Sequence, residues 1–161
     1  MEKPARRFRP VHGILLVLFV SGLVLGAQFL YEGGLTRPKY QRVASDRQGV
    51  VRLDVADLAP SRVRFFRFIN SGNQEVKFLV ARDAEGGLHT AFDASENDFK
   101  MRRGFRQDGD WIVNNKCETS CRLEEISLGG GCRPVPFRHR VDGATLVIAE
   151  QELLEGWRYF R

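Results

Sequence analysis

The sequence predicts a mainly β protein of the α+β class: a single N-terminal transmembrane helix followed by a compact antiparallel β domain with short helices. Segments rich in β-branched and aromatic residues are separated by turn signals. No charged side chain occurs between Pro10 and Tyr31. We therefore expect a cytoplasmic tail and membrane anchor over residues 1–31, a linker over 32–49 and an exported domain over 50–161.

The uncharged run from Pro10 to Tyr31 is long enough for one membrane span, because roughly 20 apolar residues cross the hydrocarbon core as a helix. A cleaved secretory signal is the alternative, but the run is longer than a usual h-region of about 7–15 residues, and Leu25 fits a cleavage site before Gln28 poorly. The basic residues at the N-terminus favour a cytoplasmic tail. These residues are Lys3, Arg6, Arg7 and Arg9. The expected location is the inner (cell) membrane, with the C-terminal domain periplasmic or otherwise extracytoplasmic.

The charge distribution does not favour a nucleic-acid partner. The net charge is +5 and the isoelectric point is about 9.4. Much of this excess lies in the N-terminal tail, and the arginines of the remainder are interspersed with acidic residues. We expect no nucleic acid to bind.

Strand signals follow the linker in order. Val51, Leu53 and Val55 alternate with polar residues, which is typical of a half-buried strand. Residues 62–70 and 74–83 flank a Ser-Gly turn and predict a hairpin. The remaining strand candidates are residues 87–94, 110–113 and 145–149.

Helical signals are short. The stretch 95–103 predicts a short helix with Ser95 as its N-cap, and the stretch 149–156 predicts another that ends at Gly156. Neither is long enough to change the expected mainly β class.

All three cysteines lie between residues 114 and 136: Cys117, Cys121 and Cys132. An exported domain allows two of them to form a disulfide, which leaves one thiol over. A metal or cluster site is the second interpretation, since the glycines before Cys132 allow backbone amides to approach a sulfur-ligated centre. A thiol-disulfide redox motif is less favoured, because the C-x-x-x-C spacing of Cys117 and Cys121 differs from the usual C-x-x-C.

Three motifs occur in a fixed order: "AFDASENDFKMRRGFRQDGDWIVNNKC", "GGGCRPVPF" and a terminal "GWRYF". Over roughly residues 60–161 the chain resembles the FtrD-like family of membrane iron-sulfur proteins. The resemblance implies association with a bacterial iron-transport system that also uses a permease, a periplasmic copper protein and a ferredoxin-like membrane protein. The expected partners are therefore the membrane and transport or ferredoxin-like membrane components.

The resemblance also implies candidate ligands, several of which are replaced here. The family pattern looks like "DACxxCY", then "GYRQxGDxxVCNxC", then "GGCxPxP". Its first cysteine pair falls on Ser95 and Asp98, and its second pair falls on Asn114 and Cys117. The cysteine of the glycine-rich turn is kept as Cys132. Two of five thiol positions remain, whereas iron-sulfur clusters are normally held by four protein ligands.

Several outcomes are open for these residues. Cys117, Cys121 and Cys132 are the predicted metal ligands, with Asp98 as a harder fourth ligand, and Cys117 and Cys132 are the predicted contacts to a cofactor. Such a set suits an iron-sulfur cluster or a single iron, zinc or copper ion. Alternatively Ser95 and Asp98 only cap a helix. A Cys117–Cys132 disulfide, worth about 3 kcal/mol, would leave no cofactor.

The leading functional hypothesis is a membrane-anchored accessory protein of metal transport, most simply iron, or of the associated electron transfer, with a degenerate cysteine metal or iron-sulfur site. The alternative is a non-catalytic structural or interaction subunit with a disulfide in place of the metal. No catalytic triad order, phosphate-binding glycine loop or H-E-x-x-H motif occurs, so we expect no enzymatic activity.

Overall fold

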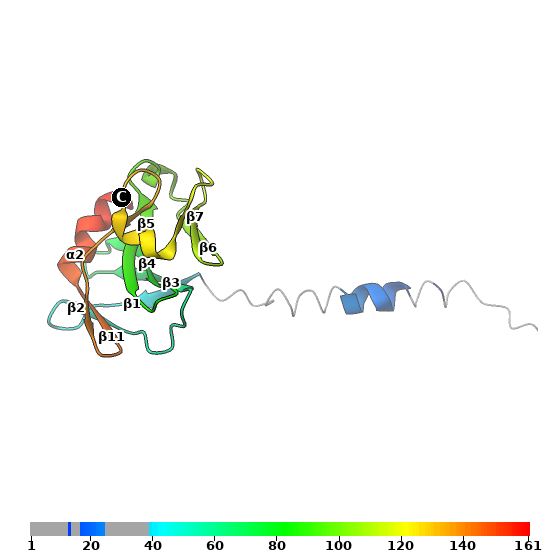
Figure 1. Cartoon of the computed structure of the whole chain (residues 1–161), viewed down its shortest axis with the longest axis horizontal. Coiled ribbons are helices and arrows are strands. Elements are labelled where there is room, and N and C mark those ends of the chain that lie inside the picture. The colour runs from blue at the N-terminus through cyan, green and yellow to red at the C-terminus, as the bar shows by residue number, and fades with distance from the viewer. Residues whose placement is uncertain (1–12, 14–16, 25–38) are drawn as a thin grey trace, which may run out of the picture. The chain divides into compact units, whose positions relative to one another are not determined.

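The computed structural model describes Gly13, residues 17–24 and residues 39–161, and it divides into the units 1–38 and 39–161 (Figure 1). In the first unit, Gly13 and residues 17–24 are helical. Among the described residues, no helix has the length and apolar character of a membrane span. Much of the transmembrane segment predicted between Pro10 and Tyr31 lies outside the described residues, so the span remains a prediction.

The unit from Lys39 to Arg161 contains three β-sheets and a few short helices. A five-stranded sheet has the order β1-β3-β4-β5-β9, and two three-stranded sheets have the orders β10-β11-β2 and β6-β7-β8. The strands are β1 (Tyr40–Val43), β2 (Val50–Asp54), β3 (Arg62–Ile69), β4 (Glu75–Arg82), β5 (Leu88–Ser95), β6 (Phe105–Asp108), β7 (Trp111–Asn114), β8 (Ser120–Arg122), β9 (Pro134–Pro136), β10 (Arg140–Asp142) and β11 (Thr145–Ala149). The helices are the α-helix α2 (Glu150–Glu155) and the 3₁₀ helices η1 (Phe99–Met101), η2 (Leu123–Leu128) and η3 (Gly156–Tyr159).

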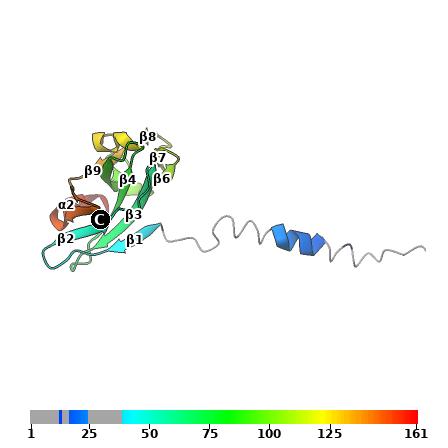
Figure 2. The ribbon, with the colours of Figure 1, turned by 60° about the horizontal axis from the view of Figure 1, so that its bottom comes forward.

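The five-stranded sheet lies between two apolar cores. Along β4, Phe78 and Val80 belong to one core, whereas Leu79 and Ala81 belong to the other. This follows from the alternation of side chains along a strand. In both ribbon views, α2 lies on one side of β4, and β6 and β7 lie on the other (Figures 1 and 2).

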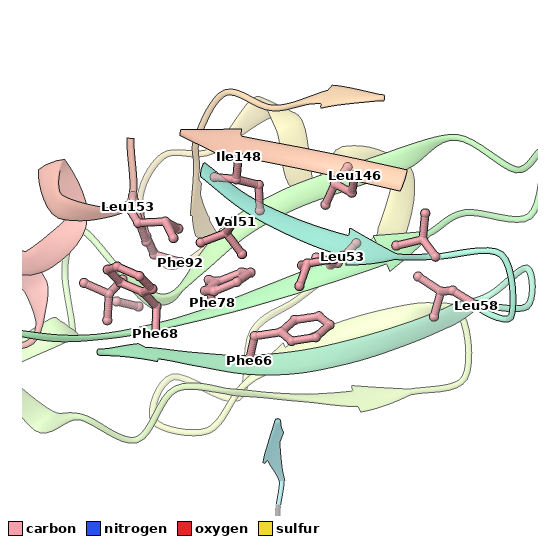
Figure 3. Close-up of a cluster of buried hydrophobic side chains, with 14 of the residues drawn as sticks. Val51, Leu53, Leu58, Phe66, Phe68, Phe78, Phe92, Leu146, Ile148 and Leu153 are labelled. Atoms are coloured by element: carbon pink, nitrogen blue, oxygen red, sulfur yellow. The ribbon is translucent and has the colours of Figure 1, made fainter. Parts of the chain in front are cut away.

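The first core forms where β2, β11 and α2 cover the aromatic face of the five-stranded sheet. Figure 3 shows Val51 and Ile148 pointing toward Phe78, and all three side chains are almost fully buried. Phe66 and Phe78 stack with ring centroids 5.2 Å apart. Each fully buried side chain of this size contributes about 1.5–3 kcal/mol, so this core is the main source of stability on this face.

Most predicted elements are present. The predicted hairpin is the β3–β4 pair, in register from Arg62 opposite Arg82 to Ile69 opposite Glu75. The strands predicted from Val51, over 87–94, over 110–113 and over 145–149 correspond to β2, β5, β7 and β11. The helix predicted to end at Gly156 is α2. A Cβ at Gly156 would lie 2.2 Å from the ring of Phe92, so glycine is required there.

Two expectations are corrected. The predicted linker contains β1, which pairs with β3 in parallel, so the folded unit begins at Lys39 and is not wholly antiparallel. The helix expected over 95–103 is a turn followed by the single 3₁₀ turn η1. Ser95 is the last residue of β5, and its hydroxyl accepts a hydrogen bond from the Asp98 amide at 3.2 Å. That hydrogen bond closes a turn between Ser95 and Asp98, and it is followed by η1 rather than by an α-helix.

Candidate metal centre

Three turns that are distant in sequence meet at one end of β5. Asp98 lies in the turn after β5, Cys117 lies in the turn after β7, and Cys132 lies in the glycine-rich turn before β9. The turns meet because β9 pairs with β5, with Ser95 opposite Pro134. We call Asp98, Cys117 and Cys132 the Cys–Cys–Asp centre.

The ligand atoms of the Cys–Cys–Asp centre converge. One atom from each residue lies within 4.8 Å of the other two. The thiol of Cys117 contacts Oδ2 of Asp98, and Sγ of Cys132 lies 3.4 Å from the same oxygen. The two sulfur atoms are 2.7 Å apart. Cys117 and Cys132 are half-buried and Asp98 is 9% exposed, so access to the donor atoms is provided mainly at the two sulfurs.

Lys116 sets the orientation of the Asp98 carboxylate. Its Nζ lies 2.6 Å from Oδ1, which leaves Oδ2 to face the two sulfurs. Hydrogen bonds from Cys117 and Lys116 lower the pKa of Asp98, and the bond to Asp98 raises the pKa of Lys116. Asp98 is therefore a carboxylate at neutral pH, and its Oδ2, which accepts from the Cys117 thiol, becomes available as a ligand when that thiol loses its proton.

The thiol of Cys117 holds its proton in this arrangement. Its hydrogen bond to Asp98, followed by its contact with Cys132, raises its pKa to about 12. Because the thiolate is the form that binds metals, binding of an ion must displace this proton.

Two of the family's other ligand positions carry polar residues that are hydrogen-bonded to each other. Nδ2 of Asn114 lies 3.4 Å from Oγ of Ser95 and 3.0 Å from the carbonyl oxygen of Cys132. Oδ1 of Asn114 accepts the backbone N–H groups of Lys116 and Cys117, at 2.9 and 3.2 Å. Asn114 is only 3% exposed. It therefore connects the two cysteine-bearing turns, a role that no sequence motif indicated.

Cys121 does not join the other two cysteines, contrary to the expected three-sulfur group. It lies in β8 opposite Ile112 and is 3% exposed, within the second core. Burial raises the pKa of its thiol to about 11. The exposed Ser120 and Arg122 on either side of it fit the alternation of a strand, which was the one signal for this placement.

The donor set does not fit an iron-sulfur cluster. The five family-type positions provide two thiols and one carboxylate, whereas such a cluster is normally held by four ligands, usually thiolates. The side chains of Ser95 and Asn114 are occupied by hydrogen bonds to each other and to the backbone. The centre instead suits one ion with an open coordination position.

Cavities adjoin the centre on two sides. Asp98 and Lys116 line a cavity of about 90 Å³, together with the two exposed arginines Arg102 and Arg103. Cys132 lines a second, more open cavity of about 380 Å³. An ion or a small thiol reagent can therefore approach the donor atoms from solvent.

The fold and the centre together define a mainly β domain whose loops gather cysteine and carboxylate donors at one end of a central sheet. A family model described as "Membrane iron-sulfur containing protein FtrD-like" matches residues 58–160, and the chain belongs to this FtrD-like family. This match confirms the resemblance found in the sequence, and the family is described as one of membrane proteins. Searches of the curated proteins and of the solved structures gave no match.

Proposed function

We propose that this protein is a membrane-anchored accessory component of iron transport, or of the associated electron transfer, whose exported domain holds one metal ion through Cys117, Cys132 and Asp98. The observation that carries this proposal is the convergence of the three ligand atoms within 4.8 Å. The membrane and iron context is supported by the family to which the chain belongs. The expected partners are transport or ferredoxin-like membrane components.

The charges around the centre favour a divalent ion. With the ion bound, two thiolates and the Asp98 carboxylate carry three negative charges. A divalent cation and the neighbouring Lys116 ammonium, 2.6 Å from Asp98, balance them. The mixed sulfur and oxygen donors suit ferrous iron or zinc, whereas a purely thiolate set would favour copper(I).

Metal analysis of the full-length protein, purified without oxygen, tests this proposal. We expect about one equivalent of iron or zinc per chain. Cys132→Ser should lose the metal, because it removes one of the two thiolates. Cys121→Ser is the matched control and should keep the metal, because Cys121 lies in the second core. Metal retained in Cys132→Ser, or absent from the unmodified protein, contradicts the proposal.

The alternative is a structural or interaction subunit in which Cys117 and Cys132 form a permanent disulfide. The 2.7 Å separation of their sulfur atoms favours it. Thiol counting separates the two when the metal-free protein is unfolded before titration, because Cys121 is buried in the folded state. A permanent disulfide leaves Cys121 as the one titratable thiol, even after the folded protein has been exposed to mild reductant.

A further inference from the structure

Cys117 and Cys132 are placed for a second chemistry besides metal binding. Two thiolates on one tetrahedral ion, each about 2.3 Å from it, lie roughly 3.8 Å apart. A disulfide bond is about 2.05 Å long. The observed 2.7 Å between the Sγ atoms lies between these values, and both side chains are partly exposed. A small movement of one of the two cysteine-bearing turns would therefore give either the spacing of a metal-bound pair or that of a disulfide.

Asn114 holds the two turns at this separation. Its Oδ1 accepts the Cys117 N–H at 3.2 Å, and its Nδ2 donates to the Cys132 carbonyl oxygen at 3.0 Å. A single buried amide thus fixes the backbone of both cysteines, which raises the effective concentration of one thiol at the other.

We propose that Cys117 and Cys132 form a reversible disulfide, that Asn114 is the positioning residue for it, and that the disulfide and the metal ion exclude each other at this site. The part concerning metal exclusion rests on the proposed function. The disulfide itself requires no metal.

The oxidation balances with a low-molecular-weight disulfide as the oxidant. One cysteine thiolate attacks a sulfur of the reagent, which breaks the reagent's S–S bond, forms a mixed disulfide and releases one small thiol. The second cysteine then attacks the mixed disulfide, forms the Cys117–Cys132 bond and releases the second small thiol. Two electrons pass from the protein thiols to the reagent, and the two thiol protons end on the released thiols.

Metal exclusion follows from the donor chemistry. Thiolates are the metal-binding form of cysteine, and a disulfide sulfur carries no negative charge. Oxidation therefore removes two of the three donors and leaves Asp98 paired with Lys116. Conversely, a bound ion occupies both sulfurs and blocks their attack on the reagent.

The test uses the full chain in detergent, reduced and stripped of metal, and equilibrated in buffers of reduced and oxidised glutathione. Peptide mapping by mass spectrometry identifies the linked cysteines, and Co²⁺ absorption reports thiolate coordination. We expect a Cys117–Cys132 link, at least tenfold weaker Co²⁺ binding in the oxidised protein, recovery of Co²⁺ binding after reduction, and at least tenfold slower oxidation when Co²⁺ is already bound.

Asn114→Asp tests the positioning role, because it keeps the oxygen that accepts from Cys117 and removes the donor to Cys132. The thiol–disulfide equilibrium constant should fall at least tenfold, with accumulation of the mixed disulfide with glutathione. Asn115→Asp is the matched control, since its side chain contacts Arg103 and Arg106, and it should leave the constant unchanged.

The outcomes separate the two proposals. Absence of a Cys117–Cys132 link at every glutathione ratio overturns this inference and leaves the proposed function standing. Equal Co²⁺ binding in the reduced and the disulfide-linked protein overturns metal exclusion together with the proposed thiolate ligands, and leaves only the reversible pair. A link that forms in a protein whose reduced state binds no Co²⁺ supports the reversible pair and overturns the proposed function together with metal exclusion. An unchanged equilibrium constant in Asn114→Asp overturns the role of Asn114.

Discussion

Single carboxylates in this domain link two different groups, because each of their two oxygen atoms has its own partner. Asp98 is paired with Lys116 through one oxygen and faces the cysteines through the other. Asp83, outside the centre, behaves similarly: Oδ1 accepts the Gly87 N–H at 2.6 Å, and Oδ2 lies 2.7 Å from Nε2 of His89. Because a carboxylate only accepts, Nε2 donates, and the Nδ1 of a neutral ring accepts from Ser127 at 2.8 Å.

The pKa of Asp83 makes stability depend on pH. Burial by itself would raise this pKa, but the hydrogen bonds from His89 and Gly87 outweigh it and hold the pKa below the ordinary 3.8. A lowered folded-state pKa stabilises the fold above the unfolded value, and this stabilisation is lost as the pH falls through the folded value. The contribution of Asp83 is therefore complete above about pH 4 and declines below it.

Asp83→Asn should remove this pH-dependent contribution. The difference in unfolding free energy between unmodified protein and Asp83→Asn, measured with denaturant from pH 7 to pH 2.5, should shrink below pH 3.8. Asp142→Asn, at an exposed position, controls for the loss of a charge. A difference that stays constant over the whole range would contradict this account.

At this scale the sequence identified part of the centre. Cys117, Cys132 and Asp98 were found because they fall on the ligand positions of a recognisable motif. Cys121 was grouped with them because it is near in sequence, but the alternation of β8 buries it in the second core. Asn114 and Lys116 were missed because their roles depend on which turns meet in space, which no local pattern encodes.

Among the elements, β1 pairs with β3 and is also held to the domain by one buried carboxylate. Asp93, whose side chain is 1% exposed, accepts hydrogen bonds from Lys39 at 2.8 Å, from the Tyr40 hydroxyl at 2.5 Å and from the Phe105 amide at 2.6 Å. Burial, followed by the charge of Asp93, raises the pKa of Tyr40, so its hydroxyl stays a donor. These bonds fix the start of the folded unit beside β5, the strand that leads to the Cys–Cys–Asp centre.

Tyr40→Phe should weaken the attachment of β1. Loss of one hydrogen bond to a buried carboxylate costs about 1.5–3 kcal/mol, which denaturant unfolding followed by tryptophan fluorescence measures. Gln41→Ala, at an exposed neighbouring position, is the control and should change stability by less than about 0.5 kcal/mol. Equal stability of Tyr40→Phe and the unmodified protein would show that β1 is held by other contacts.

Most of the elements that the sequence predicted are the longer, apolar ones, although β7, with four residues, was also predicted. β3, β4 and β5 each have eight residues, and their composition indicates strands without knowledge of their partners. β1, β6, β8, β9 and β10 have three or four residues, which is too short for a period to be recognised. These strands form by pairing with neighbouring strands, and those neighbours are not indicated by the local sequence. The linker boundary was misplaced for this reason.

At the scale of the whole domain, the residues of the two apolar cores and the residues of the Cys–Cys–Asp centre are different sets. The side chains of the central sheet pack on both faces, and the Cys–Cys–Asp centre is formed by turns at the end of β5, outside both cores. Cysteines in the centre are therefore open to ligand exchange, whereas the thiol of Cys121 is enclosed. Ser95, Asp98 and Asn114, which occupy the other family-type positions, belong to neither core.

X-ray absorption spectroscopy at the metal edge of the loaded full-length protein tests the central claim most directly. A single ion held by Cys117, Cys132 and Asp98 predicts two sulfur neighbours at about 2.3 Å, oxygen or nitrogen neighbours at about 2.0–2.2 Å, and no metal–metal scattering. Metal–metal scattering, or a third sulfur neighbour, would contradict the account.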